Sequence, residues 1–125
     1  PPGKHCLPDY PNGFCQLANI AIAVAAARAE GLTERVAIVD WDVHHGNGTE
    51  AIYYDRADTL TISLHQDRNY PLDTGDFADR GSGAGAGANL NIPLPPGTGH
   101  VGYLEAFERL VLPTLHAFQP ARSAE

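Results

Sequence analysis

Apolar runs about as long as β-strands recur along the chain, and segments with helical spacing lie around and between them. The run at 36–39 is continuous rather than alternating, which is typical of a strand buried in a parallel sheet. Residues 35–40, 59–64 and 88–94 are predicted as strands on the basis of their apolar and β-branched content. Because helical segments separate these strands, the pattern predicts an α/β fold with a parallel sheet.

Three helices are predicted, over 14–30, 48–55 and 100–117. Gly31 is a natural stop for the first, whose alanines favour close packing against the sheet. Thr49 is available as an N-cap for the second. Pro113 is the expected position of a kink in the third. The apolar stripes are Leu17, Ile20, Ala21, Val24 and Ala27 in the first helix, and Tyr103, Phe107, Leu110, Val111 and Leu115 in the third.

Two long segments are predicted as loops. Residues 1–12 are rich in proline and glycine, and residues 66–87 contain a glycine-alternating run. A loop as long as 66–87 inside a small domain is usually functional. Its glycines do not indicate a phosphate-binding loop, because neither a Gly-Lys-Ser/Thr sequence nor a strand–glycine–helix context accompanies them.

Titratable side chains are concentrated directly after the first predicted strand, within residues 40–50. In an open α/β sheet, ligands bind at the carboxyl ends of the strands. Asp42 and His44 lie two residues apart, so an extended backbone would place both side chains on the same side. A carboxylate oxygen and an imidazole nitrogen suit zinc or a similar divalent ion. The alternative is a loop whose polar residues only cap the next helix.

Residues 40–49 read DWDVHHGNGT and resemble the metal loop of the histone deacetylase family, in the form of class II and bacterial deacetylase-like amidohydrolases. The resemblance extends through PPG at 1–3 with His5, GFC at 13–15, ISLH at 62–65 and NIP at 91–93, up to about residue 120. It implies a three-layer α/β fold of the arginase/deacetylase type. We expect residues 1–125 to form an incomplete domain of this kind, about its middle third.

The resemblance implies zinc-dependent hydrolysis of an acetyl-amide, with Asp42 and His44 as the first two metal ligands. His5 matches the family's general base and acid, although a lone loop histidine is more often simply solvated. Asn47 matches the residue that orients this histidine, and Asp40 the carboxylate that orients a neighbouring active-site histidine. The family's third metal ligand and its transition-state tyrosine lie in later segments that this chain does not contain. We therefore expect the chain alone to be inactive.

Lys4 departs from the family pattern, which has two adjacent histidines after Pro-Pro-Gly. A charged ammonium donates hydrogen bonds but accepts none. We expect Asp40 to neutralise Lys4, and the added positive charge to lower the pKa of His5. A catalytically silent homologue, which binds acylated amines or only scaffolds a complex, is therefore an alternative to an active enzyme.

The resemblance also places two aromatic side chains, Phe14 and Tyr70, on the walls of a tunnel for the acyl-lysine stem. The alternative for Phe14 is a core residue that opens the first helix. Cys15 is expected to be a packed thiol rather than a nucleophile. His45 and His65 match family positions that are structural rather than liganding.

A structural potassium ion behind the zinc loop is implied as well. Asp40 would provide a side-chain oxygen and Ser63 its hydroxyl, and oxygen-only coordination suits a hard cation. The alternative for Ser63 is a buried hydroxyl satisfied by the backbone. The remaining ligands would be the backbone carbonyls of Asp42, His44 and Leu64, and a second cation site would use carbonyls near Tyr53, Arg56, Thr59 and Ala88.

Composition and net charge narrow the range of possible binding partners. The chain is 43% hydrophobic and 18% charged, as globular proteins are, and its net charge of −7 without a basic stripe argues against direct nucleic-acid binding. An acidic protein favours a cationic partner, which leaves acetylated lysine and acetylated polyamine both open as substrates. Two cysteines, with no visible secretory or membrane-spanning segment, lead us to expect a cytoplasmic protein without a membrane partner. The sequence does not predict an oligomeric state.

Overall fold

Three parallel strands form the centre of the structure, a computed structural model that describes residues 3–120. β1 (Val36–Asp40), β2 (Thr59–Gln66) and β3 (Asn89–Leu94) pair in that order, with Asp40 opposite Ser63. The predicted strands are confirmed to within two residues at each end. Residues 1–2 of the N-terminal motif and the tail at 121–125, which the predicted domain includes, lie outside the described residues.

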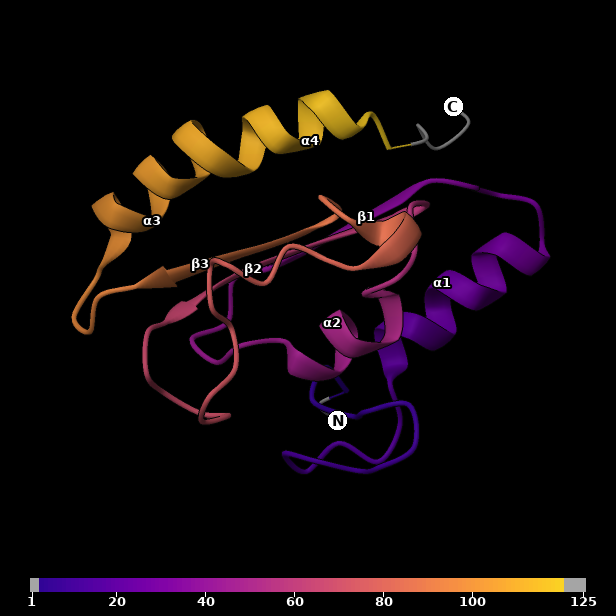
Figure 1. The fold of residues 1–125 in the computed structure, drawn as a ribbon, viewed down its shortest axis with the longest axis horizontal. Helices are drawn as coiled ribbons and strands as arrows, with labels where there is room; N and C mark the ends of the chain where they lie inside the picture. The colour runs from indigo at the N-terminus through magenta and orange to yellow at the C-terminus, as the bar shows by residue number, and fades with distance from the viewer. Residues whose placement is uncertain (1–2, 121–125) are drawn as a thin grey trace.

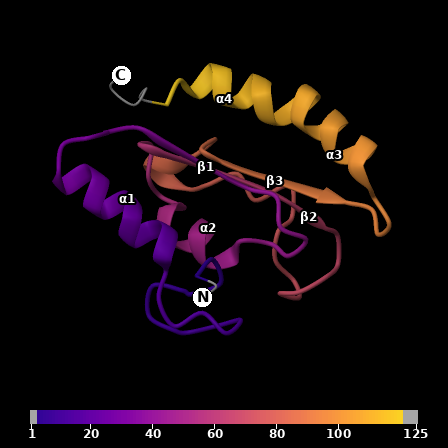
Figure 2. The same cartoon turned by 180° about the vertical axis from the view of Figure 1, so that it is seen from behind.

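Helices cover both faces of the sheet and give three layers (Figures 1 and 2). α1 (Asn19–Ala29) and α2 (Asn47–Tyr53) lie on one face. α3 (His100–Ala106) and α4 (Leu112–Phe118), joined by the π-helical turn Phe107–Val111, run along the other. This arrangement confirms the predicted parallel-sheet α/β fold. Within residues 3–120, none of the helices is long and apolar enough to cross a membrane.

The apolar core lies between the sheet and the α3–α4 helix. Alternate residues of β2 and β3 point into it, and helix residues spaced three or four apart cover them. Leu110 was predicted to join this stripe but is 39% exposed, whereas its neighbour Val111 is fully buried. The π-helical turn adds a residue to the helix at this point, which shifts the buried face. The buried members are Leu60, Ile62, Leu64, Leu90, Ile92, Ala106 and Val111.

The opposite face of the sheet is polar yet equally buried. Thr61, Ser63 and His65 of β2 lie beside Asn89 and Asn91 of β3, and all are less than a tenth exposed. A continuous apolar strand buried on both faces is therefore not what forms, and β1 is only half-buried along its whole length. Among residues 3–120 no buried side-chain nitrogen or oxygen lacks a hydrogen-bond partner, which makes this polar layer stable.

The first helix begins at Asn19, five residues later than predicted. Gly13 and Phe14 both have positive φ, 56° and 61°, and the residues on either side form an isolated antiparallel bridge. The backbone therefore turns before it becomes helical.

The predicted packing of the first helix is also only partly right. Val24 is its only buried residue, while Leu17 and Ile20 are 62% and 48% exposed. The helix thus rests on one narrow line of small side chains.

The other two helices differ from the prediction in detail. Thr49 lies inside α2, where it is buried and makes no capping hydrogen bond; the N-cap residue is Gly46. The irregularity in the last helix lies before Pro113, in the π-helical turn, and Pro113 itself sits in the first turn of α4. A proline is tolerated there because the turn needs no N–H from it.

Candidate functional site

The N-terminal loop is fixed directly above the carboxyl end of β1. The backbone N–H groups of Gly48 and Thr49 donate to the carbonyl of Lys4, at 2.9 and 3.1 Å. A side chain on Gly48 would collide with the backbone of Cys6, so only glycine allows this approach. The contact holds Lys4 and His5 over the loop that follows β1.

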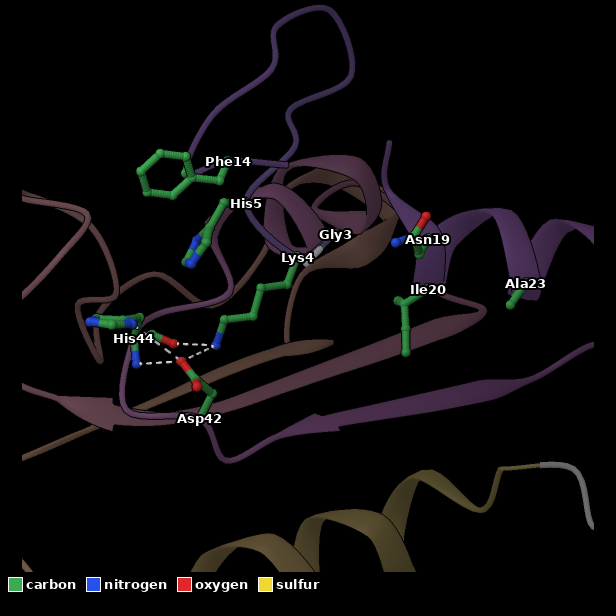
Figure 3. Close-up of a pocket in the computed structure, with 10 residues that line it drawn as sticks. Gly3, Lys4, His5, Phe14, Asn19, Ile20, Ala23, Asp42 and His44 are labelled. Atoms are coloured by element: carbon green, nitrogen blue, oxygen red, sulfur yellow. Dashed lines mark hydrogen bonds and ion pairs between the residues drawn. The ribbon is translucent and has the colours of Figure 1, made fainter. Parts of the chain in front are cut away.

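The Lys4 ammonium lies among three oxygens at the carboxyl end of β1, and Figure 3 draws two of the residues that provide them, Asp42 and His44. Its Nζ is 2.9 Å from Asp40 Oδ2 and 2.9 Å from Asp42 Oδ1, and it donates to the His44 carbonyl at 2.6 Å. The predicted pairing with Asp40 is confirmed. The contacts with Asp42 and His44 were missed, because sequence spacing does not show how far a lysine stem reaches.

Asp42 and His44 do lie together, but not for the predicted reason. The segment bends rather than extends, and Asp42 Oδ1 accepts a hydrogen bond from the His44 N–H at 2.9 Å. This local side-chain turn brings the His44 ring back, so that its Nδ1 is 3.4 Å from the same oxygen. The two side chains are 54% and 41% exposed, and therefore open to a ligand.

The donor set suits a divalent metal without completing a site. Burial alone would raise the pKa of Asp42, but hydrogen bonds from Lys4 and from the His44 N–H outweigh it and lower the pKa. The carboxylate is therefore ionised at neutral pH, as a metal ligand must be. No cluster of three or more His, Cys, Asp or Glu side chains that could hold a metal occurs within residues 3–120. Asp42 and His44 thus offer two donors of the zinc type.

His5 is buried beside this pair, and its Nδ1 lies 2.8 Å from Asn47 Oδ1. Because an amide oxygen only accepts, Nδ1 carries the proton and Nε2 is left as the basic nitrogen. Burial is the largest cause of a lowered His5 pKa; the Asn47 hydrogen bond acts against it, and the charge of Lys4 lowers the pKa further. The predicted direction is confirmed, although Lys4 is not the main cause.

Aromatic rings border the same space. Tyr70 stands edge-on to His5 and His44, with ring centroids 5.4 and 6.0 Å apart. Phe14 is 99% exposed and precedes the helix, so the alternative of a core phenylalanine is wrong. It stands at the rim of an open cavity of about 620 Å³ (Figure 3). The cavity, large enough for a small organic group, is lined by Gly3, Lys4, His5, Gly13, Phe14, Asn19, Ile20, Ala23, Asp42 and His44.

Behind the loop, a mostly buried carboxylate accepts three hydrogen bonds. Glu50 Oε2 accepts from His45 Nε2 at 2.8 Å, from Asn91 Nδ2 at 2.8 Å and from Asn89 Nδ2 at 3.2 Å. Burial alone would raise the pKa of Glu50, but these donors together lower it. The sequence analysis missed this carboxylate. The signal was the pair of asparagines two apart in a strand, which places both amides on one face.

The same network holds the long loop at 66–87. His45 Nδ1 is 3.0 Å from Thr74 Oγ1, and His65 Nε2 donates to the Gly75 carbonyl at 2.9 Å. Both rings are used within the fold, as expected for structural histidines, and Cys15 is a fully buried free thiol, also as expected. The loop that carries Tyr70 is thereby fixed to the sheet.

The expected potassium ligands lie beside a small cavity, but several of their oxygens already make hydrogen bonds within the protein. A cavity of about 10 Å³, room for a single small ion or water, lies between Asp40 and Ser63. The Ser63 hydroxyl donates to His65 Nδ1 at 2.9 Å and accepts from the Gly46 N–H at 3.3 Å, so it is already satisfied. The His44 carbonyl accepts from Lys4. In the second expected cation site, the carbonyls of Tyr53 and Ala88 accept backbone hydrogen bonds.

Comparison with known proteins places these features in one family. Residues 1–122 match the family described as Histone deacetylase domain. The chain is 58% identical over 120 residues to the histone deacetylase-like amidohydrolase of Pseudomonas aeruginosa, covering 96% of this chain and 32% of the relative. It is 45% identical over 121 residues to histone deacetylase 14, chloroplastic, of Arabidopsis thaliana, with 96% and 28% covered.

A solved structure agrees with this placement. The acetylpolyamine aminohydrolase from Burkholderia pseudomallei matches with a TM-score of 0.89 and 42% identity, covering 96% of this chain and 35% of that one. The chain therefore spans about a third of the length of the relatives it matches.

Proposed function

Because the chain belongs to the histone deacetylase family, we propose that it forms part of a metal-dependent hydrolase of acetyl-amides whose substrate is acetylated lysine in proteins. The chain spans about a third of its relatives' length, so the proposal concerns the domain-length protein. The observation that carries it is the meeting of Asp42, His44 and the oriented His5 ring beside one open cavity.

Asp42 and His44 would hold zinc, together with a third ligand from elsewhere in the domain. A zinc ion in such a site polarises a carbonyl and makes water acidic near neutral pH. The exposed, ionised carboxylate and the neighbouring imidazole support this assignment. Potassium is proposed behind the loop, at the cavity between Asp40 and Ser63, where a cation would brace the backbone.

His5 would act as the proton carrier. Its lowered pKa keeps the ring neutral at pH 7, and the Asn47 hydrogen bond leaves Nε2 free to take a proton from the attacking water. The same nitrogen would then deliver a proton to the leaving amine. Phe14, which lines the cavity, and Tyr70, which lies against the rings of His5 and His44, would flank the substrate stem.

Two alternatives have a specific observation in their favour. Similarity to an acetylpolyamine aminohydrolase favours an acetylated polyamine as substrate. The Lys4 ammonium on Asp42 favours a silent homologue that binds acylated amines without cleaving them.

The test uses the domain-length protein with an acetyl-lysine peptide and an acetylated polyamine, measuring acetate release and bound zinc. Asp42→Ala is expected to lose zinc and turnover together. Asp40→Asn should keep zinc and lose about 10–100-fold in rate, because the Asp40 carboxylate would not bind zinc itself but would orient residues that surround it. Asp55→Asn, at an exposed aspartate, is the control and should change neither.

The outcomes separate the alternatives. Bound zinc without turnover of either substrate identifies the silent homologue, and preference for the polyamine identifies the alternative enzyme. Retained zinc in Asp42→Ala would show that the metal ligands are wrongly assigned.

A further inference from the structure

Lys4 is the only lysine in the 125-residue sequence, and it stands where the resemblance leads one to expect a histidine. Its Nζ is within 3 Å of oxygens from Asp40, Asp42 and His44. Three oxygens around one ammonium satisfy all three of its N–H donors. The side chain is 21% exposed, so this position is built into the fold and is not a solvent-exposed ion pair.

The ammonium shares an oxygen with the proposed metal ligands. Asp42 Oδ1 lies 2.9 Å from Lys4 Nζ, and the same oxygen lies 3.4 Å from His44 Nδ1. A divalent ion held by Asp42 and His44 would meet a positive charge on the same carboxylate. Like charges at such a short distance repel, and the repulsion is poorly screened where the groups are partly buried.

We propose that Lys4 is a tethered cation that neutralises Asp42 and Asp40 in the metal-free protein and competes with divalent metal for the Asp42 carboxylate. This inference rests on the proposed metal site at Asp42 and His44. It assigns Lys4 as a residue that sets metal affinity, and not as a catalytic group.

The backbone makes this competition effective. The carbonyl of Lys4 is held by the N–H groups of Gly48 and Thr49, so the ammonium stays within reach of the loop when it is displaced. A tethered competitor acts at a high effective concentration. The contact with the His44 carbonyl, at 2.6 Å, also holds the ammonium beside the Asp42 carboxylate.

A second consequence concerns the protein without metal. Asp40 and Asp42 are both within reach of one ammonium, and without it two carboxylates would face each other uncompensated. The loop after β1 is therefore expected to keep its shape in metal-free protein as long as Lys4 is present. Replacement of Lys4 by a neutral residue should make the stability of the protein depend on zinc.

The experiment measures the Kd for Zn²⁺ by competition with a chromophoric chelator, and the Tm with and without Zn²⁺. It compares the domain-length protein with its Lys4→Gln variant, with Lys4→Met as a second neutral variant, and with Lys4→Arg, which keeps the charge. Arg56→Gln is the matched control, because it removes one positive charge from an exposed ion pair with Asp58. The Tm of each metal-free variant shows whether it folds.

The neutral variants are expected to bind Zn²⁺ about tenfold more tightly, because they remove a like charge from the Asp42 carboxylate and with it the competitor for that ligand. Lys4→Arg and Arg56→Gln should bind as the original chain does. The metal-free Tm should fall in the neutral variants and rise again with Zn²⁺.

Equal or weaker Zn²⁺ binding in both neutral variants overturns the inference and leaves the proposed function standing. Absence of Zn²⁺ binding in every variant overturns both. A tenfold gain that also appears in Arg56→Gln would assign the effect to net charge and not to Lys4.

Discussion

Two clusters of acids and histidines lie back to back at the end of β1, and they are built in opposite ways. The front cluster, Lys4 with Asp40, Asp42 and His44, is partly exposed and faces an open cavity. The rear cluster is centred on Glu50, which is 17% exposed, and the donors around it, His45, Asn89 and Asn91, are buried and point at partners within the fold.

The difference shows that residue type alone does not decide function. Imidazoles and carboxylates occur in both clusters, but only the front one leaves donor atoms open to a ligand. An ion pair with a half-exposed partner, such as Lys4–Asp42, contributes little to stability, whereas buried donors that lose their carboxylate acceptor are costly. The rear cluster is therefore the support, and the front cluster is the part that can change when a ligand binds.

The largest effect is expected in the rear cluster. Glu50→Ala would leave the buried donors of His45, Asn89 and Asn91 without their acceptor, and should cost about 3 kcal/mol or more in unfolding free energy. Denaturant unfolding measures this. Glu105→Ala, which removes an exposed helix pair with Arg109, should cost about 0.5 kcal/mol or less. Similar losses in both variants would remove the distinction between support and site.

The contact between the N-terminal loop and the start of α2 can be broken at one glycine. A methyl group on Gly48 meets the backbone of His5 and Cys6 and must push the N-terminal loop away from α2. Gly48→Ala should cost about 2 kcal/mol by overpacking. Gly99, where an added Cβ meets nothing, is the control. If Gly99→Ala lowers the Tm as much as Gly48→Ala does, the close approach of the two backbones is not the reason for the loss of stability at position 48.

Acid should weaken the fold through two buried histidines outside these clusters, His5 and His65. The pKa of His65 is lowered chiefly by burial, as is that of His5. Below about pH 6.5 these histidines bind protons in the unfolded chain but not yet in the folded chain. The unfolding free energy therefore decreases as the pH is lowered, until the pH reaches the pKa of the folded state. Each histidine contributes a slope of up to about 1.4 kcal/mol per pH unit.

Unfolding free energies at about pH 7 and about pH 5.5 test this. The difference between the two should shrink in His65→Gln and in His5→Gln. An unchanged difference in both variants would contradict the role of their burial.

The smallest effect on stability is expected in the front cluster. Asp42→Asn keeps the shape of the side chain and removes one charge from a half-exposed pair, so the metal-free protein should lose less than about 1 kcal/mol. Chemical unfolding beside the Glu50→Ala variant gives the comparison. A loss as large as that of Glu50→Ala would mean that the front cluster also supports the fold.

The strands followed from the sequence because runs of apolar and β-branched residues mark them, and the three layers followed from the family resemblance. The start of α1 did not, because Gly13 and Phe14 adopt left-handed backbone conformations that the apolar pattern does not reveal. The π-helical turn before Pro113 was also missed, because one added residue rotates the buried face of the helix without changing the residues that the sequence offers for it.

At the candidate site, the motif placed Asp42, His44, His5 and Asn47 near one another. What it could not place was the reach of Lys4 to Asp42, which depends on the close approach of two backbones at Gly48. Glu50 was missed for a different reason: two of its three partners, Asn89 and Asn91, come from β3, some forty residues away in sequence. Contacts between distant segments are set by the folded topology, and no local pattern reports them.

The central claim is that Asp42 and His44 form a metal site which Lys4 occupies when metal is absent. Anomalous diffraction at the zinc edge, from crystals of the protein grown with and without Zn²⁺, tests it most directly. In crystals grown with Zn²⁺, we expect a zinc peak at Asp42 and His44, with Lys4 withdrawn from Asp42. In crystals grown without Zn²⁺, we expect the Lys4–Asp42 contact to be intact. Zinc bound elsewhere, for example at Glu50 and His45, or zinc at Asp42 with Lys4 still in contact, would contradict it.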